Sequence, residues 1–244
     1  MMSDQPFKVE LDTNKMILVF GDQKAGKTSL VGTAPKDFRV HIIDTDGGWG
    51  PAKRLALHRG IDVDKLWTRV YPKTFKELHV ALWSLPPEKD LYVLDTFTTC
   101  MKLFKSSVQP GIQETDWKKV GGKVSGLAID YFDHFRRQVA IQNAWGLVLC
   151  QDKLKEVSPE VERLCPDLVG ASGRDAAGMV AHLLHYERLR EVTTVDGKKV
   201  PVWKRVLRTE ETVGCMAGDR SDALAKPHEE ADLELIINKI TNAR

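Results

Sequence analysis

The sequence predicts an α/β fold with a mostly parallel central sheet, flanking helices and a C-terminal antiparallel hairpin extension. Short apolar runs rich in Val, Ile and Leu alternate with stretches whose apolar residues recur at helical spacing, which is typical of parallel strands joined by helices. A glycine-rich turn follows the first run, and acidic or amide residues end several others. Because open α/β sheets bind ligands at the carboxyl ends of their strands, these residues predict one binding site.

The first strand leads into the pattern G-x-x-x-x-G-K-[ST]. An apolar run over 16–20 is joined to a helix by what we call the P-loop motif: Gly21, Asp22, Gln23, Lys24, Ala25, Gly26, Lys27, Thr28 and Ser29. The glycines let backbone amides surround a phosphate at the start of the helix. Lys27 is predicted to reach the β- and γ-phosphates and Thr28 to bind Mg²⁺. The pattern therefore predicts a nucleoside triphosphate site.

Three later strands end in polar residues. The run 38–43 leads into an Asp-Thr-Asp-Gly-Gly segment that contains Asp46, although an Asp-rich turn would have the same composition. The run 90–94 ends at Asp95, a Walker B pattern whose carboxylate accepts hydrogen bonds from Mg²⁺-bound water. The run 145–150 ends at Gln151, which we expect to sense the γ-phosphate and to pass its state to a loop over 152–174.

Helical spacing and turn signals place the remaining elements. We expect helices over 51–59, after the capping box Thr74-x-x-Glu77, over 124–142 and over 229–241, and a short strand over 66–70. The runs 183–195 and 200–207 read as two strands, and the Asp-Gly turn between them predicts an antiparallel hairpin. Basic residues outnumber acidic residues in this hairpin.

The stretch 102–123 reads as a basic loop, because Ser, Pro and Gly pairs punctuate it. Trp117, Lys118, Lys119 and Lys123 are candidates for contact with single-stranded DNA, since cations follow the backbone and an indole stacks on a base. A solvated surface loop would have the same composition, so both interpretations stand.

The composition limits the other classes of function. A net charge of +2 does not by itself require a nucleic-acid partner. Four widely separated cysteines argue against a zinc ribbon and a disulfide framework, and His182 and His185 read as structural rather than metal-binding. No run of about 18 apolar residues occurs, so we expect a cytoplasmic protein without membrane insertion.

Taken together, these segments resemble the ATPase core of RecA. The most specific stretches are Ile43-Asp44-Thr45-Asp46-Gly47-Gly48-Trp49-Gly50-Pro51 and Gly60-Ile61-Asp62-Val63-Asp64-Lys65-Leu66. The chain looks most similar to the compact phage-encoded members, the Sak-type single-strand annealing ATPases and related nucleotide-binding proteins. The resemblance implies one RecA-like domain over 1–244, with a core at about 14–151 and a C-terminal loop, hairpin and helix at about 152–244.

The resemblance also implies roles for individual residues. Asp46 corresponds to the glutamate that activates the attacking water, Gln151 to the γ-phosphate sensor, and Asp95 to Walker B. Arg220 matches a late basic residue thought to reach the nucleotide of a neighbouring subunit. Two positions depart from the pattern: Asp46 is one methylene shorter than the usual glutamate, and Gly218 stands where a lysine is often found.

The function implied is that of an ATP-binding, Mg²⁺-dependent ATPase, with slow turnover, acting on single-stranded DNA in phage-type recombination. Head-to-tail homo-oligomers, a ring or a filament, and a bacterial host's cytoplasm belong to the same expectation. An alternative is a nucleotide-switched scaffold or loader that binds a phage single-strand binding, replication or recombination protein with little DNA-dependent turnover. A small-molecule or nucleotide kinase is a third alternative.

Overall fold

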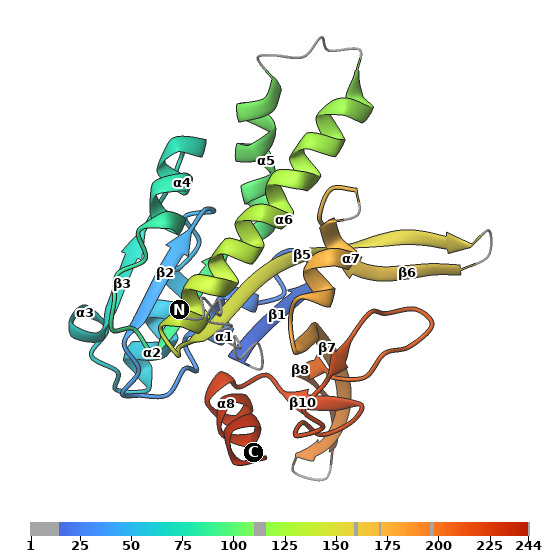
Figure 1. The fold of residues 1–244 in the computed structure, drawn as a ribbon. Coiled ribbons are helices and arrows are strands. Elements are labelled where there is room, and N and C mark those ends of the chain that lie inside the picture. Colours follow the sequence, from blue (N-terminus) through green and yellow to red (C-terminus); the bar gives the residue numbers. More distant parts are fainter. Residues whose placement is uncertain (1–14, 110–115, 159–160, 171, 196–197, 244) are drawn as a thin grey trace, which may run out of the picture.

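The computed structural model describes residues 15–109, 116–158, 161–170, 172–195 and 198–243. Its centre is a 10-stranded sheet with the order β10-β8-β7-β1-β5-β4-β2-β3, in which β6 also pairs with β5 and β9 with β7 (Figure 1). The chain is therefore an α/β protein with a mostly parallel central sheet flanked by helices, as the alternation of apolar runs predicts.

The parallel strands form the middle of the sheet. β1 (Met16–Gly21) lies between β5 (Trp145–Ser158) and β7 (His182–Val195), and β4 (Leu91–Asp95) lies between β5 and β2 (Val40–Asp44). β3 (Trp67–Val70) forms the edge beside β2. Strands buried on both faces read as continuous apolar runs, which is why the sequence located them well.

Helices cover both faces of this sheet. One face packs on α1 (Lys27–Val31), α2 (Gly50–His58) and α8 (Leu233–Asn242), whereas the other packs on α4 (Phe75–Trp83), α5 (Phe97–Val108), α6 (Trp117–Ile141) and α7 (Ser172–Gly178). A short helix, α3 (Val63–Leu66), precedes β3. Alternate residues of β1 enter the two cores, so one strand links both layers.

The prediction of a loop over 102–123 is wrong for its described residues. α5 continues to Val108 because Cys100, Met101 and Phe104 bury an apolar stripe. α6 begins at Trp117, seven residues before the predicted start, with Asp116 as its N-cap. Buried Val120 and Val124 offset the low helix propensity of Gly121 and Gly122. Residues 110–115 of the predicted loop lie outside the described residues.

The loop predicted over 152–174 is also wrong. β5 continues past Gln151 to Ser158 and pairs antiparallel with β6 (Val161–Pro166), and α7 follows. The charged side chains that suggested a loop stand on a ribbon that extends from the sheet, where both faces accept polar residues (Figure 1). Residues 159–160 and 171 lie outside the described residues.

The C-terminal hairpin exists as predicted. β8 (Lys198–Arg208) pairs antiparallel with β7 from His185 to Val195, while the turn residues 196–197 lie outside the described residues. Two short strands follow, β9 (Gly218–Asp219) and β10 (His228–Glu230). The last helix begins at Leu233, later than predicted, because Asp232 caps it and the preceding residues pair with β8.

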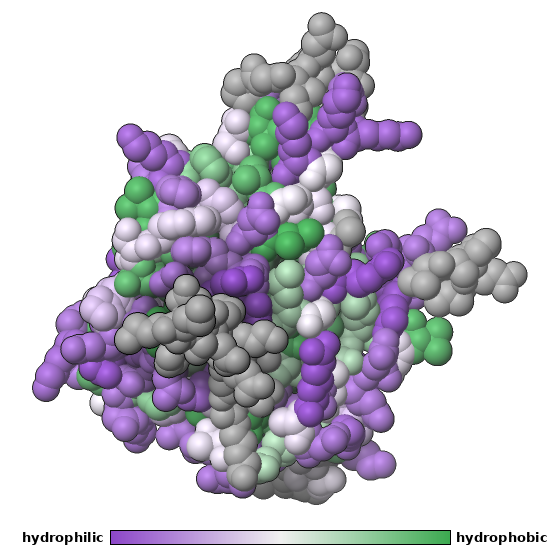
Figure 2. Space-filling view, viewed as in Figure 1, coloured by the Kyte–Doolittle hydropathy of each residue, from purple (hydrophilic) through white to green (hydrophobic). Residues whose placement is uncertain are grey.

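The surface is mixed. Figure 2 shows hydrophilic side chains interspersed with small hydrophobic groups over the face that it presents. Within the described residues, no helix is long and apolar enough to cross a membrane.

Candidate functional site

The carboxyl ends of four strands bring the predicted site residues to one edge of the sheet. Gly21 pairs in register with Gln151, and Asp44 with Asp95. Because parallel strands share one direction, the P-loop motif, the acidic segment after β2, Asp95 and Gln151 all lie at this edge.

The P-loop motif wraps around the Lys27 side chain. Gly26 has φ 112°, a left-handed conformation that favours glycine, and it is the N-cap of α1. Lys27 Nζ donates to the carbonyl oxygens of Gly21 and Asp22, both at 2.8 Å. The side chain is buried, and this burial lowers the pKa of the ammonium group, although nearby carboxylates oppose the shift. Lys27 is thus held at the motif by backbone carbonyls.

Thr28 and Asp95 meet as the Walker B pattern requires. Thr28 Oγ1 donates to Asp95 Oδ2 at 2.7 Å. Burial raises the pKa of Asp95 to about 7, with Asp44 and Asp46 adding to the rise and Thr28 and Lys27 opposing it. The second carboxylate oxygen, Oδ1, is buried and makes no hydrogen bond. A hydroxyl beside an unsatisfied carboxylate oxygen fits the oxygen donors that Mg²⁺ prefers.

The two acids after β2 have different environments. Asp44 is fully buried, accepts backbone N–H groups from residues 46–49 and forms an ion pair with Arg69 at 2.6 Å, so it shapes the turn. Asp46 is exposed, and its carboxylate accepts the hydroxyls of Thr96 and Thr99 at the start of α5. Asp46 is therefore the acid available to a ligand.

These residues line one cavity of about 540 Å³. Predicted residues that line it are Gln23, Lys24, Gly26, Lys27, Thr28, Ser29, Asp46 and Gln151. The other predicted residues of the site lie behind this lining. Asp95 accepts a hydrogen bond from Thr28, which lines the cavity. The carbonyl oxygens of Gly21 and Asp22 accept hydrogen bonds from Lys27, and Ala25 is buried. The structure brings the predicted nucleotide site together.

Sequence reasoning missed two arginines of this cavity. Arg54 from α2 and Arg205 from β8 line it together with the P-loop motif. A side chain built on Gly26 would meet the Tyr186 hydroxyl at 3.3 Å and the Arg205 guanidinium carbon at 3.5 Å, so both lie against the motif. Arg188 from β7 donates to the Lys24 carbonyl oxygen at 3.0 Å. The excess of basic residues in the predicted hairpin was the sequence signal that could have pointed to Arg205.

Five predicted residues lie elsewhere. Arg220 is exposed and lines a separate cavity of about 290 Å³ beside Arg174 and Gly178. Lys118, Lys119 and Lys123 are exposed on the first turns of α6, which packs on the other face of the sheet from α1, and Trp117 begins that helix. Because Lys119 pairs with Asp116, part of this charge is already neutralised.

Comparison with known proteins gives no family for this chain. None of the protein-family models matches the sequence, and neither does any curated protein.

Proposed function

We propose that the protein is an ATP-binding, Mg²⁺-dependent ATPase of the RecA-like type that acts on single-stranded DNA. The observation that carries the proposal is the cavity in which the P-loop motif, the Thr28–Asp95 pair, Asp46 and Gln151 converge. Four cationic side chains line it against one carboxylate, Asp46, which suits a polyphosphate.

Each side chain has a role that follows from its position. Lys27 and the amides of the motif stabilise negative charge on the β- and γ-phosphates. Thr28 and Asp95 are the residues that would hold Mg²⁺, which neutralises phosphate charge when bound. Asp46 orients water, and Gln151 reports the γ-phosphate to the β5–β6 ribbon that follows it.

One face of the β7–β8 hairpin supports a role with nucleic acid. The register places Arg188 opposite Arg205, Arg190 opposite Trp203 and Thr194 opposite Lys199. This face, called here the basic hairpin face, carries no acid among its described residues, whereas Glu187 and Glu191 stand on the opposite face. Trp203 is 64% exposed, and the face begins at the nucleotide cavity with Arg205. It replaces Trp117, Lys118, Lys119 and Lys123 as our proposed DNA contact.

The position of Arg220 favours an assembly of several subunits. This exposed side chain lies in a different cavity from the P-loop motif of its own chain. A head-to-tail contact that places it on the neighbour's nucleotide requires a heterologous interface, which produces a ring or a filament.

A nucleotide-switched scaffold is the second candidate. It is favoured by one observation: the two carboxylate oxygens of Asp46 accept the hydroxyls of Thr96 and Thr99, which competes with the use of Asp46 as a base for water. In this case ATP acts as a conformational ligand, and the basic hairpin face or another surface holds a replication or recombination protein.

Steady-state ATP hydrolysis with and without single-stranded DNA, at two salt concentrations, tests the proposal. We expect turnover that DNA stimulates and that salt suppresses, since contacts to phosphates release counterions. Asp46→Ala is expected to spare ATP binding and to stop turnover. ATP binding without any effect of DNA would favour the scaffold, and absence of ATP binding would contradict both candidates.

A further inference from the structure

A second group of polar side chains lies next to the P-loop motif. Asp152, His185 and Glu187 line a cavity of about 480 Å³ together with Asp22 and Lys24 of the motif. Gln151 faces the nucleotide cavity, while Asp152, the next residue of β5, faces this second one. Cys215, from the loop between β8 and β9, completes what we call the His185 cluster: Asp152, His185, Glu187 and Cys215.

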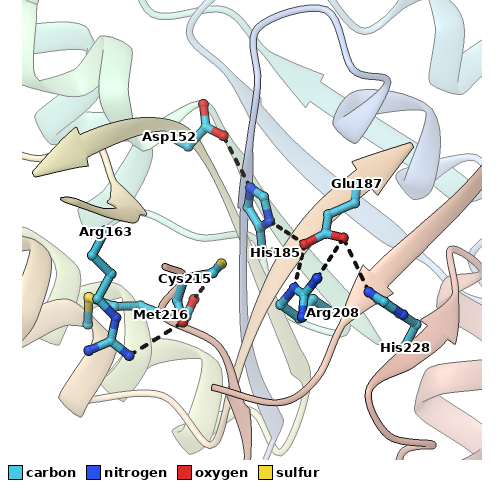
Figure 3. A network of polar contacts seen from close by, with 8 residues as sticks. All are labelled: Asp152, Arg163, His185, Glu187, Arg208, Cys215, Met216 and His228. Atoms are coloured by element: carbon cyan, nitrogen blue, oxygen red, sulfur yellow. Dashed lines mark hydrogen bonds and ion pairs between the residues drawn. The ribbon is translucent and has the colours of Figure 1, made fainter. Parts of the chain in front are cut away.

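Three of these side chains can reach one metal ion. His185 and Glu187 are two residues apart on β7, so they point to the same side of the strand. Cys215 approaches from the β6 side with its sulfur directed toward His185 (Figure 3). One ligand atom from each lies within 4.8 Å of the others. Ligands around a tetrahedral Zn²⁺ ion are separated by about 3.3–3.8 Å, so small adjustments suffice.

The backbone and neighbouring side chains hold this arrangement. The Leu164 N–H donates to the Gly214 carbonyl oxygen and the Met216 N–H to the Leu164 carbonyl oxygen, which fixes the loop on both sides of Cys215. His185 Nε2 lies 3.1 Å from Asp152 Oδ2, while Nδ1 lies 2.9 Å from Glu187 Oε1 (Figure 3). Arg208 and His228 bond the Glu187 carboxylate in turn.

We propose that His185 Nδ1, Glu187 Oε1 and Cys215 Sγ bind a Zn²⁺ ion. A histidine that ligates through one nitrogen and donates its other N–H to a carboxylate is a recurrent arrangement around zinc, and Asp152 supplies that carboxylate. The thiol and the imidazole select a borderline-soft ion over Mg²⁺ or Ca²⁺. The adjoining cavity leaves room for water as a fourth ligand.

Binding exchanges protons for the metal. In the structure, the hydrogen bond between His185 Nδ1 and Glu187 Oε1 occupies the position that the ion would take. The Nδ1 proton and the Cys215 thiol proton leave to solvent, and the proton on Nε2 stays in its bond to Asp152. The site is independent of the proposed ATPase activity, although Asp22 and Lys24 connect its cavity to the P-loop motif.

Titration of the metal-free full chain with Co²⁺, followed by displacement with Zn²⁺, tests the inference. We expect one Co²⁺ per chain with a thiolate-to-cobalt charge-transfer band. Cys215→Ser is expected to lose the band and to weaken binding at least 100-fold, and Asp152→Asn to weaken it about 10- to 100-fold. Cys165→Ser removes another buried thiol, and this control is expected to keep both the band and the affinity. Lys27→Ala is also expected to keep them, which separates this site from the nucleotide site.

Two results would overturn the zinc site: no thiolate band in the wild-type chain, or equal affinity in Cys215→Ser. If the serine variant does not fold by circular dichroism, Cys215→His provides the second test. It supplies another zinc ligand, so we expect it to bind Co²⁺ without the thiolate band. A thiolate band that persists in this variant would place the ion at a different cysteine and contradict the proposal.

Discussion

The two walls of the proposed nucleotide cavity are built in different ways. The N-terminal wall is the P-loop motif, in which the bonds from Lys27 to the Gly21 and Asp22 carbonyl oxygens join residues close in sequence. The C-terminal wall consists of Arg205, which lies against Gly26 together with the Tyr186 hydroxyl. The neighbouring bond from Arg188 to the Lys24 carbonyl oxygen spans 164 residues. The first wall depends on a local motif, whereas the second exists only because β7 lies beside β1. A motif search therefore finds one half of the site.

The largest expected effect is the loss of ATP affinity when the N-terminal wall is altered. Lys27→Ala removes the buried ammonium group that the motif holds, and charge-assisted hydrogen bonds contribute about 1.5–3 kcal/mol each. We expect ATP affinity, measured by calorimetry, to fall at least about 100-fold. Lys36→Ala, at an exposed lysine outside the cavity, is the matched control and is expected to bind normally. Wild-type affinity in Lys27→Ala would remove the motif from the site.

The next effect concerns the acid beneath the N-terminal wall. Asp95, with a pKa of about 7 instead of its usual value near 3.8, is largely protonated below neutral pH. Mg²⁺ requires the ionised carboxylate, so binding of the ion releases this proton. After correction for the titration of the nucleotide itself, the affinity of the protein for Mg²⁺-nucleotide is expected to rise about tenfold per pH unit up to pH ~7 and then to level off. Asp95→Asn is the control, because this variant lacks the titrating carboxyl group while the nucleotide still titrates. An identical pH profile in this variant would show that Asp95 does not hold the ion.

A smaller effect is expected at the C-terminal wall. Arg205→Ala removes one partly solvated charge from the cavity, so we expect ATP affinity to fall about 5- to 10-fold. Lys204→Ala is the matched control, since Lys204 is the neighbouring exposed cation on the opposite face of β8. If both variants bind equally well, the C-terminal wall is not part of the site.

The smallest expected effect is on DNA binding by the part of the β7–β8 hairpin that lies outside the cavity. Replacing Arg190 and Lys199 with Ala removes two cations of the basic hairpin face that do not line the nucleotide cavity. The salt dependence of single-stranded DNA affinity is expected to decrease by about 0.7 in slope per lost phosphate contact. The rival variant replaces Lys118, Lys119 and Lys123. A slope that changes only in this rival would return the DNA contact to α6.

The same contrast explains what the sequence could predict. Strong local signals identified the P-loop motif, the capping box at Thr74 and the buried parallel strands. Local signals misled at the surface: Gly121 and Gly122 concealed the beginning of α6, and the charged residues after Gln151 concealed a β-ribbon. In both places tertiary packing or strand pairing overrides weak propensity.

Long-range contacts of the site were beyond the sequence. Arg205 enters the cavity, and Cys215 reaches His185, only through the order of strands in the sheet. Asp44 and Asp46, which look equivalent in sequence, differ because burial and the ion pair with Arg69 commit Asp44 to the turn.

Hydrogen–deuterium exchange of the full chain with and without Mg²⁺-ATP tests the central claim most directly, since it reports both walls in one experiment. We expect slower exchange in the P-loop motif and, to a smaller extent, in β8 around Arg205, with no change at the start of α6. Protection elsewhere, with the P-loop motif unchanged by ATP, would contradict the assignment of this cavity as the nucleotide site.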